Sequence, residues 1–449
     1  MYKIILAIRY LIKRRITYLA VLAVALCVFM VVVVMTVMTG LVRDFKIKNH
    51  NWIGDCVVSS DSLVGFPYYE EFIGMLERED FIEAVSPVIK SYGILSYEGS
   101  EWNNSVEVLG IEPVRHNSVS GFGRTLYYRK DDVSKAFNPV YEPNVSGIIL
   151  GIDMLVSRDE FGRYKHREEI PAVSFAVSCF PLTAGGGLAK GGLGLVNTKT
   201  FYYSDNSHSG LAKEDGSFVY LAFEEAQMLC GMGGANKRVS AIHIKFKPNV
   251  RLQTGCDKVS RLWAEFAAKT GNRKGADLLS KVKVESWKGY KREVIAAVEK
   301  EQMVMMAVFV LIGIITVFIV FVVFYMIVSH KSKDIGILKS IGGKNSDIVS
   351  LFLYFAFFVG VLGSAIGTGG GVLFLTKINA IEKWLYDQYG FQLWNRMLYA
   401  IDEIPNKIEF DTLAIIITCA ILACLFGALI PSWQAARLKP VETLQVSQL

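Results

Sequence analysis

The sequence predicts a membrane α-helical protein with four transmembrane helices, both termini in the cytoplasm, and a large α+β extracytoplasmic domain inserted between helices 1 and 2. Two observations predict this fold class. Four stretches lack charged residues, and each is long enough to cross the hydrocarbon core of a bilayer as a helix, which takes about 20 residues. A polar segment large enough to fold as a domain separates the first stretch from the second. The predicted transmembrane helices are residues 16–42, 302–329, 348–376 and 412–436.

The charge of the connecting segments predicts the side of the membrane that each one occupies. The N-terminal segment 1–15 has five basic residues and no acidic residue, and the loop 330–347 has four lysines against two aspartates. The loop 377–411 instead has six acidic and four basic residues. Because short basic segments stay in the cytoplasm, residues 1–15, 330–347 and the tail 437–449 are predicted to be cytoplasmic. Residues 43–301 and 377–411 then lie outside, and the basic charge reflects this topology rather than a nucleic-acid partner.

The extracytoplasmic segment 43–301 is predicted to be an α+β domain with helical stalks. Alternating apolar residues predict strands, and apolar residues at helical spacing predict helices. The expected strands are 55–60, 105–111 and 239–246, and the expected helices are 68–78 and 254–269. Residues 41–51 continue the first transmembrane helix, and residues 285–301 form an amphipathic helix that enters the second. Such a stalk fits either the transmission of motion or a passive spacer.

Four of the seven cysteines lie in the extracytoplasmic segment: Cys56, Cys179, Cys230 and Cys256. Their spacing has no C-x-x-C pattern and does not specify a pairing, so disulfides and free thiols both remain open. The glycine-rich stretch 185–194 lacks the G-x-x-x-x-G-K-[ST] pattern of a phosphate-binding loop. This stretch is predicted to be a flexible loop.

The sequence contains no pattern typical of a catalytic, metal or cofactor site. The six histidines are not spaced as metal ligands, and no G-x-S-x-G nucleophile motif occurs. Gly342, Gly343 and Lys344 resemble the end of a P-loop, but Asn345 stands where serine or threonine is required. The chain is therefore predicted not to be an enzyme. It is expected to bind no cofactor and not to hydrolyse ATP by itself.

The loop after the second predicted span contains a short amphipathic pattern. Ile335, Leu338 and Ile341 recur every three residues, so a helix here would have one apolar edge and one basic face. Such a helix fits the groove of a partner protein. It fits equally well a position at the membrane surface that anchors the loop.

The third predicted span contains a row of glycines, namely Gly360, Gly363, Gly367 and Gly371. The last three are four residues apart and form two overlapping G-x-x-x-G units. Glycines at this spacing let helix backbones approach closely. The row predicts close helix packing, either within the bundle or across a dimer.

At several segments the chain resembles the MacB/FtsX/LolC–LolE class of ABC transporter permeases. The loop segment 334–342 and the tail segment 431–442 are similar to signatures of the whole class. Segments similar to the lipoprotein-releasing permeases LolC and LolE in particular are 7–15, 37–40, 147–151 and 391–405. The chain departs from the family pattern at Asp334, where a glutamate is usual, at Lys344, where a small residue is commoner, and in the stretch 185–194.

The resemblance implies a non-catalytic permease in a bacterial inner membrane, with its large domain in the periplasm. It implies that ATP and Mg²⁺ are bound by a separate, LolD-like ATPase subunit, which contacts a coupling helix in the loop 330–347. The residues expected at that contact are Lys333, Asp334, Ile335, Gly336, Ile337, Leu338, Lys339, Ile341 and Gly342.

The resemblance also implies further partners and a mode of action. The expected partners are a second permease copy or a sister permease, a lipoprotein substrate and a periplasmic carrier. In this class of mechanotransmission machines, a stalk passes the closure of the ATPase to the outer domain. Two alternatives stay open: a MacB-type efflux permease for peptides, toxins or drugs, and an FtsX-type regulator of a periplasmic hydrolase. An FtsX-type regulator is expected to have a much smaller insert than residues 43–301.

Overall fold

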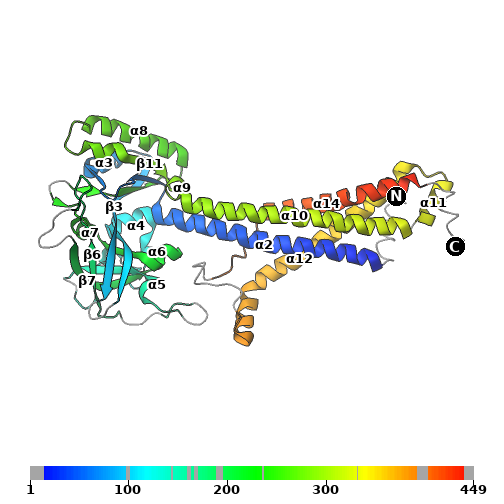
Figure 1. Ribbon diagram of the computed structural model, residues 1–449, viewed down its shortest axis with the longest axis horizontal. Helices are drawn as coiled ribbons and strands as arrows, with labels where there is room; N and C mark the ends of the chain where they lie inside the picture. Colours follow the sequence, from blue (N-terminus) through cyan, green and yellow to red (C-terminus); the bar gives the residue numbers. More distant parts are fainter. Residues whose placement is uncertain are drawn as a thin grey trace. The chain divides into compact units, whose positions relative to one another are not determined.

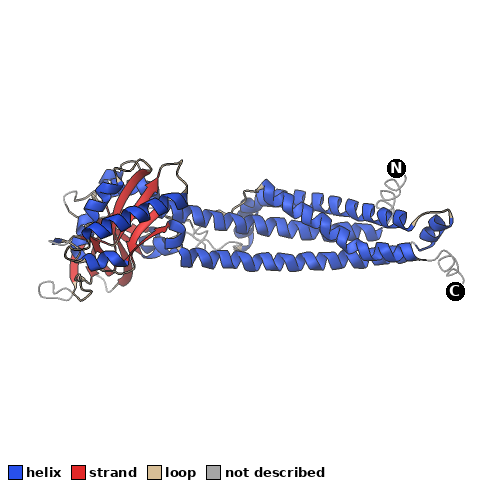
Figure 2. Cartoon of the chain, turned by 90° about the horizontal axis from the view of Figure 1, so that it is seen from above, coloured by secondary structure: helices blue, strands red, loops and turns tan. Residues whose placement is uncertain are grey.

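The computed structural model describes residues 15–97, 102–142, 145–158, 163–165, 170–188, 196–234, 237–330, 332–391 and 403–438. The chain divides into two compact units. One unit comprises residues 1–43, 297–394 and 403–449, and it contains the long apolar helices. The other comprises the described residues of 44–296, and it contains the β-sheet (Figure 1, Figure 2). Residues 1–14, most of the stretch 185–194 and most of the loop 391–405 lie outside the described residues.

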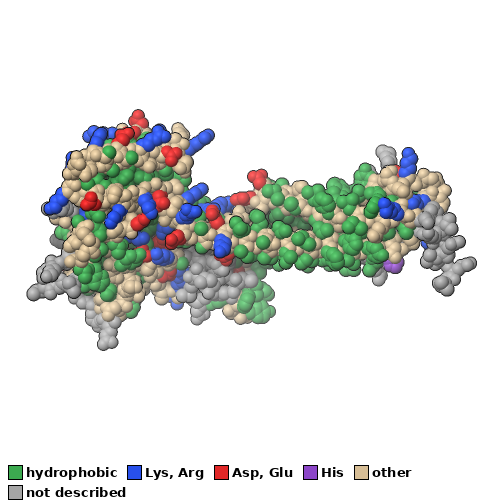
Figure 3. Space-filling view, turned by 45° about the horizontal axis from the view of Figure 1, so that its top comes forward, with side chains coloured by type: hydrophobic (Ala, Val, Ile, Leu, Met, Phe, Trp, Pro, Cys, Tyr) green, Lys and Arg blue, Asp and Glu red, His purple; other side chains and the backbone are tan. Residues whose placement is uncertain are grey.

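Four helices of the described chain are long and apolar enough to cross a membrane. They are α2 (Arg15–Ile53), α10 (Arg292–His330), α12 (Asn345–Tyr389) and α14 (Phe410–Arg437), and α11 (Ser332–Ser340) follows α10. Each of the four predicted spans is therefore helical. Figure 3 shows that hydrophobic side chains cover most of the visible face of the helical unit.

The third helix is longer than predicted. Residues 377–389, which were assigned to the loop 377–411, continue α12 as far as Tyr389. Leu375 and Ile378 are both buried, so tertiary packing holds the helix on both sides of the predicted end. The helix stops at Gly390, whose φ of 65° is a left-handed conformation that favours glycine.

The predicted amphipathic helix 285–301 starts two residues late and is interrupted. Glu285 and Ser286 belong to strand β11 (Val282–Ser286) because they pair with Val57 and Cys56 of strand β1. The Ser286 side chain then accepts a hydrogen bond from the Gly289 N–H and caps the short helix α9 (Trp287–Tyr290). Lys291 separates α9 from α10.

The sheet unit is built on nine strands in the order β11-β1-β10-β3-β4-β8-β5-β7-β6. Their bounds are β1 Cys56–Ser60, β3 Ile82–Tyr97, β4 Asn103–Ile111, β5 Gly147–Gly151, β6 Ser174–Cys179, β7 Asn197–Ser207, β8 Phe218–Ala222, β10 Ala241–Phe246 and β11 Val282–Ser286. A separate small sheet pairs β2 (Phe66–Pro67) with β9 (Arg238–Val239). The expected strands 55–60 and 105–111 are confirmed, whereas 239–246 is divided at Ser240 between β9 and β10.

The long strand β3 closes part of the sheet on itself. Its first half pairs with β10, and its last residues, Gly93–Tyr97, pair with β6. Because β6 also pairs with β7, the strands β3, β4, β8, β5, β7 and β6 form a closed ring. Buried apolar side chains fill this ring, among them Leu95, Val108 and Val219.

Short helices cover the sheet. They are α3 Tyr69–Leu76, α4 Pro113–Ser120, α5 Ile152–Leu155, α6 Ala212–Ser217, α7 Phe223–Leu229 and α8 Leu252–Thr270, with the 3-10 turns η1 Phe122–Thr125, η2 Val133–Lys135 and η4 Ala276–Lys281. The helices expected at 68–78 and 254–269 are confirmed as α3 and α8. In α8, Val259, Trp263 and Phe266 are buried and pack in the same core as the ring. This core makes the sheet unit the folded domain that the sequence predicts.

Candidate functional site

The short helix α11 is amphipathic, but its apolar face is not the predicted one. Ile335 is 2% exposed and packs in the core of the helical unit, together with side chains of α10 and α12. Ile337 and Ile341 are 49% and 80% exposed. The predicted edge of Ile335, Leu338 and Ile341 is therefore divided, because bundle packing buries its first member. The exposed apolar pair is Ile337 and Ile341, which are four residues apart and thus neighbours on a helical path.

The end of α11 depends on glycine. Gly342 has a φ of 99°, which residues with a side chain rarely adopt. The N–H groups of Gly342 and Gly343 donate hydrogen bonds to the carbonyls of Lys339 and Leu338, at 3.0 Å each. This cap satisfies carbonyl groups at the helix end and turns the chain toward α12.

Lys339 fixes α11 to the end of α14. Its Nζ donates hydrogen bonds to the carbonyl oxygens of Ala436 (2.6 Å) and Leu438 (2.8 Å). The last carbonyls of a helix have no partner within the helix, and a cation there also complements the helix dipole. Lys339 therefore positions α11 from within the chain, whereas Lys333 is exposed.

The glycine row of α12 lies against two other helices of the same chain. A Cβ atom at Gly363 would lie 2.7 Å from Val24 Cγ1, and one at Gly371 would lie 2.9 Å from Val32 Cγ1. At Gly367 it would clash with the carbonyl oxygen of Ala25 and lie 2.8 Å from Val28 Cβ. Gly360 instead faces α14, where a Cβ would lie 3.2 Å from Ile421 Cα. The sequence leaves open whether the glycine row packs within the bundle or across a dimer. The contacts observed here are within the bundle.

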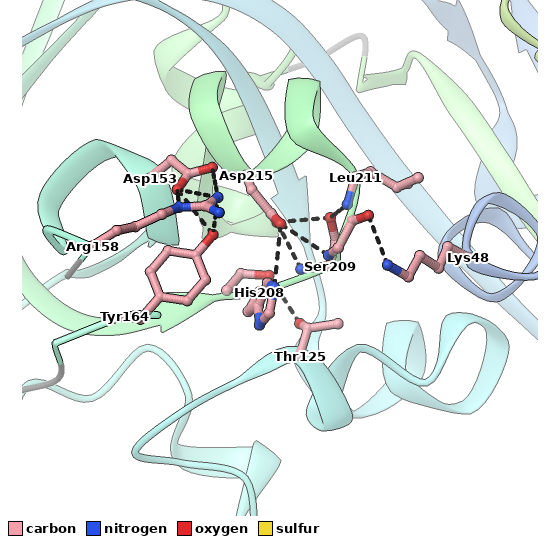
Figure 4. Close-up of polar contacts among 11 residues, drawn as sticks. Lys48, Thr125, Asp153, Arg158, Tyr164, His208, Ser209, Leu211 and Asp215 are labelled. Carbon is pink, nitrogen blue, oxygen red and sulfur yellow. Dashed lines mark hydrogen bonds and ion pairs between the residues drawn. The ribbon is translucent and has the colours of Figure 1, made fainter. Parts of the chain in front are cut away.

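Two lysines anchor the sheet-unit ends of α2 and α10 to the same short segment. Lys48 of α2 donates a hydrogen bond to the Gly210 carbonyl at 3.1 Å (Figure 4). Lys291, directly before α10, forms an ion pair of 2.8 Å with Glu214 of α6, and both side chains are largely buried. Trp52 of α2 lies beneath Lys291, with its ring centroid 4.8 Å from Nζ. The segment 210–214 therefore contacts the ends of both long helices.

A buried aspartate holds the turn that precedes α6. Asp215 accepts hydrogen bonds from the backbone N–H groups of Ser209 (2.7 Å) and Gly210 (2.9 Å) and from the Ser209 hydroxyl (2.8 Å) (Figure 4). His208 Nε2 lies 3.9 Å from Asp215 Oδ2. Because the Ser209 hydroxyl donates to Asp215 and not to His208, these residues do not have the geometry of a serine-histidine-aspartate relay. They stabilise the turn that Lys48 contacts.

An aromatic cavity of about 340 Å³ opens beside the closed ring of strands. Its lining includes Tyr97, Trp102, Phe175 and Tyr203. Asn206 also lines it and is 1% exposed, and its amide makes no well-formed hydrogen bond among the described residues. Such a cavity can hold an apolar group with an amide beside it. No cluster of three metal-ligating side chains occurs in the part of the chain that the structure describes.

His116 of α4 and His243 of β10 are both buried where this helix packs on the sheet. His116 Nδ1 lies 3.3 Å from the Ser86 hydroxyl, and the rings of His116 and His243 are 5.7 Å apart. Burial lowers the pKa of His116 to about 4. Burial, and then the positive charges of His116, Lys291 and Lys90, lower the pKa of His243 well below its usual value. Both histidines are therefore neutral at pH 7.

Acidification is expected to destabilise the sheet unit because of these histidines. An unfolded histidine has a pKa near 6.5, so between pH 6.5 and 4 the unfolded chain binds a proton that folded His116 does not. The stabilisation is complete above pH 6.5 and is lost as the pH falls toward 4, at a cost of about 3 kcal/mol for His116. Urea unfolding of the full chain in detergent, followed by tryptophan fluorescence at pH 7.5 and 4.5, measures this loss.

The His116→Gln variant should lose part of the pH dependence. His208→Gln is the matched control because His208 is partly exposed. Equal pH dependence of the unfolding free energy in His116→Gln and in the unmodified chain would show that His116 is not its source.

Comparisons with known proteins agree with this arrangement of helices and inserted domain. Residues 306–440, which contain most of α10 and all of α11, α12 and α14, match the FtsX-like permease C-terminal family. The chain is 21% identical to the lipoprotein-releasing system transmembrane protein LolC of Xylella fastidiosa (strain 9a5c), over 95% of this chain and 92% of that protein. The similarity to LolC therefore extends over nearly the whole length of both proteins.

Another similar protein is LolC of Neisseria meningitidis serogroup B (strain MC58). That protein is 22% identical over 96% of this chain and 94% of its own length. Among solved structures, the periplasmic region of MacB from Actinobacillus actinomycetemcomitans aligns with a TM-score of 0.30 and 13% identity, over 55% of this chain and 95% of that one. The family match and the two LolC matches confirm the resemblance to the MacB/FtsX/LolC–LolE class of ABC transporter permeases.

Proposed function

We propose that this permease releases lipoproteins from the inner membrane to a periplasmic carrier. The observation that carries the proposal is the length of the match to LolC, which extends over 95% of this chain and 92% of the Xylella protein. The match therefore includes the sheet unit as well as the helical unit. Both LolC relatives are described as parts of a lipoprotein-releasing system.

In this proposal the large sheet unit is periplasmic, and both termini and α11 are cytoplasmic. The argument is the distribution of charge, since lysine and arginine predominate in the segments 1–15 and 330–347 and acidic residues predominate in 377–411. The chain is then a multi-pass protein of a bacterial inner membrane. Its described helices α2, α10, α12 and α14 are the four membrane spans.

The permease works by mechanotransmission with a separate ATPase subunit that binds ATP and Mg²⁺. Ile337 of α11 and Ile341, directly after it, are the apolar side chains that the ATPase covers, and Lys339 links α11 to α14. The glycine contacts between α12 and α2 let these helices move together. Motion then reaches the sheet unit through Lys48 and Lys291, which anchor α2 and α10 to the segment 210–214.

A substrate held at the outer leaflet fits the composition of the spans. The predicted spans 16–42, 302–329, 348–376 and 412–436 contain no Asp, Glu, Lys or Arg. Ionisable residues inside spans usually mark the path of a polar substrate. Removing an acyl chain from lipid costs about 0.8 kcal/mol per CH₂ group, so release of a lipid-anchored protein requires coupling to ATP hydrolysis.

The helical unit has apolar surface for a second permease, either another copy or a sister protein. Along α10 the exposed apolar side chains include Ile314, Phe318 and Tyr325. A membrane span can present such a face to lipid or to another helix. The proposed complex contains two permeases, the ATPase and the periplasmic carrier, in a lipid bilayer.

Depletion of the permease is expected to leave lipoproteins in the inner membrane. Membrane fractionation of depleted cells measures this, and vesicles that contain the permease and its ATPase should release a lipoprotein only when ATP and a soluble carrier are present. Normal lipoprotein sorting with raised sensitivity to toxins would instead favour a MacB-type efflux permease. Normal sorting with a loss of cell-wall hydrolase activity would favour an FtsX-type regulator.

A further inference from the structure

The four cysteines of the sheet unit lie in two pairs. Cys56 is the first residue of β1, and Cys256 is in α8, which packs against β1. Cys56 is 0% exposed and Cys256 is 6% exposed, and both belong to the main core of this unit. The two thiols lie within hydrogen-bonding reach of each other.

The second pair is built where the ring of strands closes. Cys179 ends β6 and lies opposite Gly93 of β3. A Cβ atom at Gly93 would lie 3.1 Å from Cys179 Sγ, so the absence of a side chain there leaves room for the sulfur atom. Cys230 follows α7, and its carbonyl accepts a hydrogen bond of 3.4 Å from the N–H of Leu182, three residues after Cys179. The thiols of Cys179 and Cys230 are also within hydrogen-bonding reach.

We infer that this chain contains two disulfide bonds, Cys56–Cys256 and Cys179–Cys230. Each joins residues from distant parts of the sequence that the fold already brings together, and the two bonds use all four cysteines of the sheet unit. The structure holds all seven cysteines as free thiols. On oxidation these four would pair, and the remaining three, Cys27, Cys419 and Cys424, which lie in predicted spans, would keep free thiols. The inference rests on the periplasmic position in the proposed function, because disulfides persist in oxidising compartments.

Oxidation of the thiols requires an external oxidant. We assign this role to the disulfide of a protein of the thiol–disulfide oxidoreductase class. For each pair, two S–H bonds break, one S–S bond forms, and two protons and two electrons leave. The oxidant's disulfide accepts them and becomes two thiols. Cys56 and Cys256 are both buried in the folded domain, so a protein oxidant cannot reach them once folding is complete. Oxidation therefore takes place while the chain folds and the cysteines are still accessible.

The two bonds reinforce the part of the sheet unit that α2 enters. Cys56 is three residues after Ile53, the last residue of α2, so its bond ties the strand that follows this helix to α8. The second bond ties β6, which closes the ring, to the end of α7. With disulfide cross-links at these two places, the domain would move as one rigid body when α2 moves.

The test uses the full chain in its native membrane. Cells are denatured in the presence of N-ethylmaleimide, and digested peptides are analysed by mass spectrometry with and without prior reduction. We expect alkylation of Cys27, Cys419 and Cys424 alone before reduction, and of all seven cysteines after it. Cross-linked peptides should join Cys56 to Cys256 and Cys179 to Cys230. Alkylation of all seven thiols without reduction, or a different pairing, would overturn the inference.

Single substitutions provide the matched controls. Cys56→Ser should release one new alkylatable thiol at Cys256 and leave the Cys179–Cys230 peptide intact, and Cys179→Ser should do the reverse. Reduction of the unmodified chain should lower its melting temperature by about 5–15 °C. A Cys56→Ser/Cys256→Ser double variant should melt close to Cys56→Ser, because either change removes the same bond.

Trypsin added to spheroplasts separates a failure of this inference from a failure of the proposed orientation. Lys274 lies in the exposed turn after α8, so a periplasmic sheet unit should be cut from outside. Cleavage from outside together with seven free thiols would refute the disulfides and leave the proposed function standing. Protection from trypsin together with seven free thiols would refute both the orientation and the disulfides.

Discussion

Replacing Gly367 with leucine is expected to stop the long helices from packing, whereas the same change at Gly369 should leave them intact. A Cβ atom at Gly367 would clash with the carbonyl oxygen of Ala25, which belongs to the backbone of α2 and cannot rotate away. A Cβ at Gly369 would meet nothing within 4 Å. Overpacking a close contact costs about 1–3 kcal/mol, and more where backbones must separate.

The measurement for Gly367→Leu is the yield and melting temperature of the protein in mild detergent, together with ATP-dependent lipoprotein release. Gly369→Leu is the matched control because it adds the same side chain to the same helix. Gly363→Leu should show an intermediate loss, because its Cβ would meet Val24 side-chain atoms first and the nearest carbonyl oxygen, that of Val21, is 3.3 Å away. If Gly367→Leu melts at the same temperature as Gly369→Leu, the glycine row does not hold α12 against α2.

The long helices of the helical unit could be predicted from sequence because a helix that crosses a bilayer needs a long stretch without charged residues. The end of α12 could not be predicted, because residues 377–389 leave the apolar stretch and remain helical through packing that hydropathy does not record. The partner of the glycine row was also undetermined. The G-x-x-x-G spacing favours a close approach, but only the fold identifies Val24, Val28 and Val32 of α2 as the neighbours.

Contacts between residues that are distant in sequence explain the other differences between the predicted and the observed structure. Glu285 and Ser286 are part of the predicted amphipathic helix 285–301, but they form a strand because β1 pairs with them. The anchors of the long helices were missed for the same reason. Lys291 and Glu214 are separated by 77 residues, and nothing in the sequence near either one indicates the pair. The inferred cysteine pairing could not be obtained from sequence either, because it depends on the contact of α8 with β1 and on the pairing of β6 with β3.

The orientation of α11 illustrates how packing selects among similar patterns. In the segment 335–341, apolar residues occur at four positions, so periodicity alone allows more than one apolar face. Bundle packing buries Ile335, and this rotates the helix so that Ile337 and Ile341 are exposed. The amphipathic segment could thus be predicted from sequence, but the apolar side chains that it exposes could not.

Changing Ile337 to aspartate is expected to abolish binding of the partner ATPase while the permease still inserts and folds. Ile337 is 49% exposed in the chain alone, so a carboxylate there contacts water and leaves the bundle unchanged. In the proposed complex with the ATPase, the same carboxylate would be buried against the apolar surface that we expect to cover Ile337. An unpaired buried charge is far too costly to retain, so copurification of the ATPase and ATP-dependent release should both fall to background.

Ser346→Asp is the matched control for this change. It adds the same side chain to the same connecting region, at an exposed position in the first turn of α12, where a negative charge is favourable. The control should keep the ATPase and the melting temperature of the unmodified chain. Ile335→Asp should instead lower the melting temperature of the chain in detergent, because Ile335 is buried in the bundle. If Ile337→Asp retains the ATPase as well as Ser346→Asp does, α11 does not couple to it through this face.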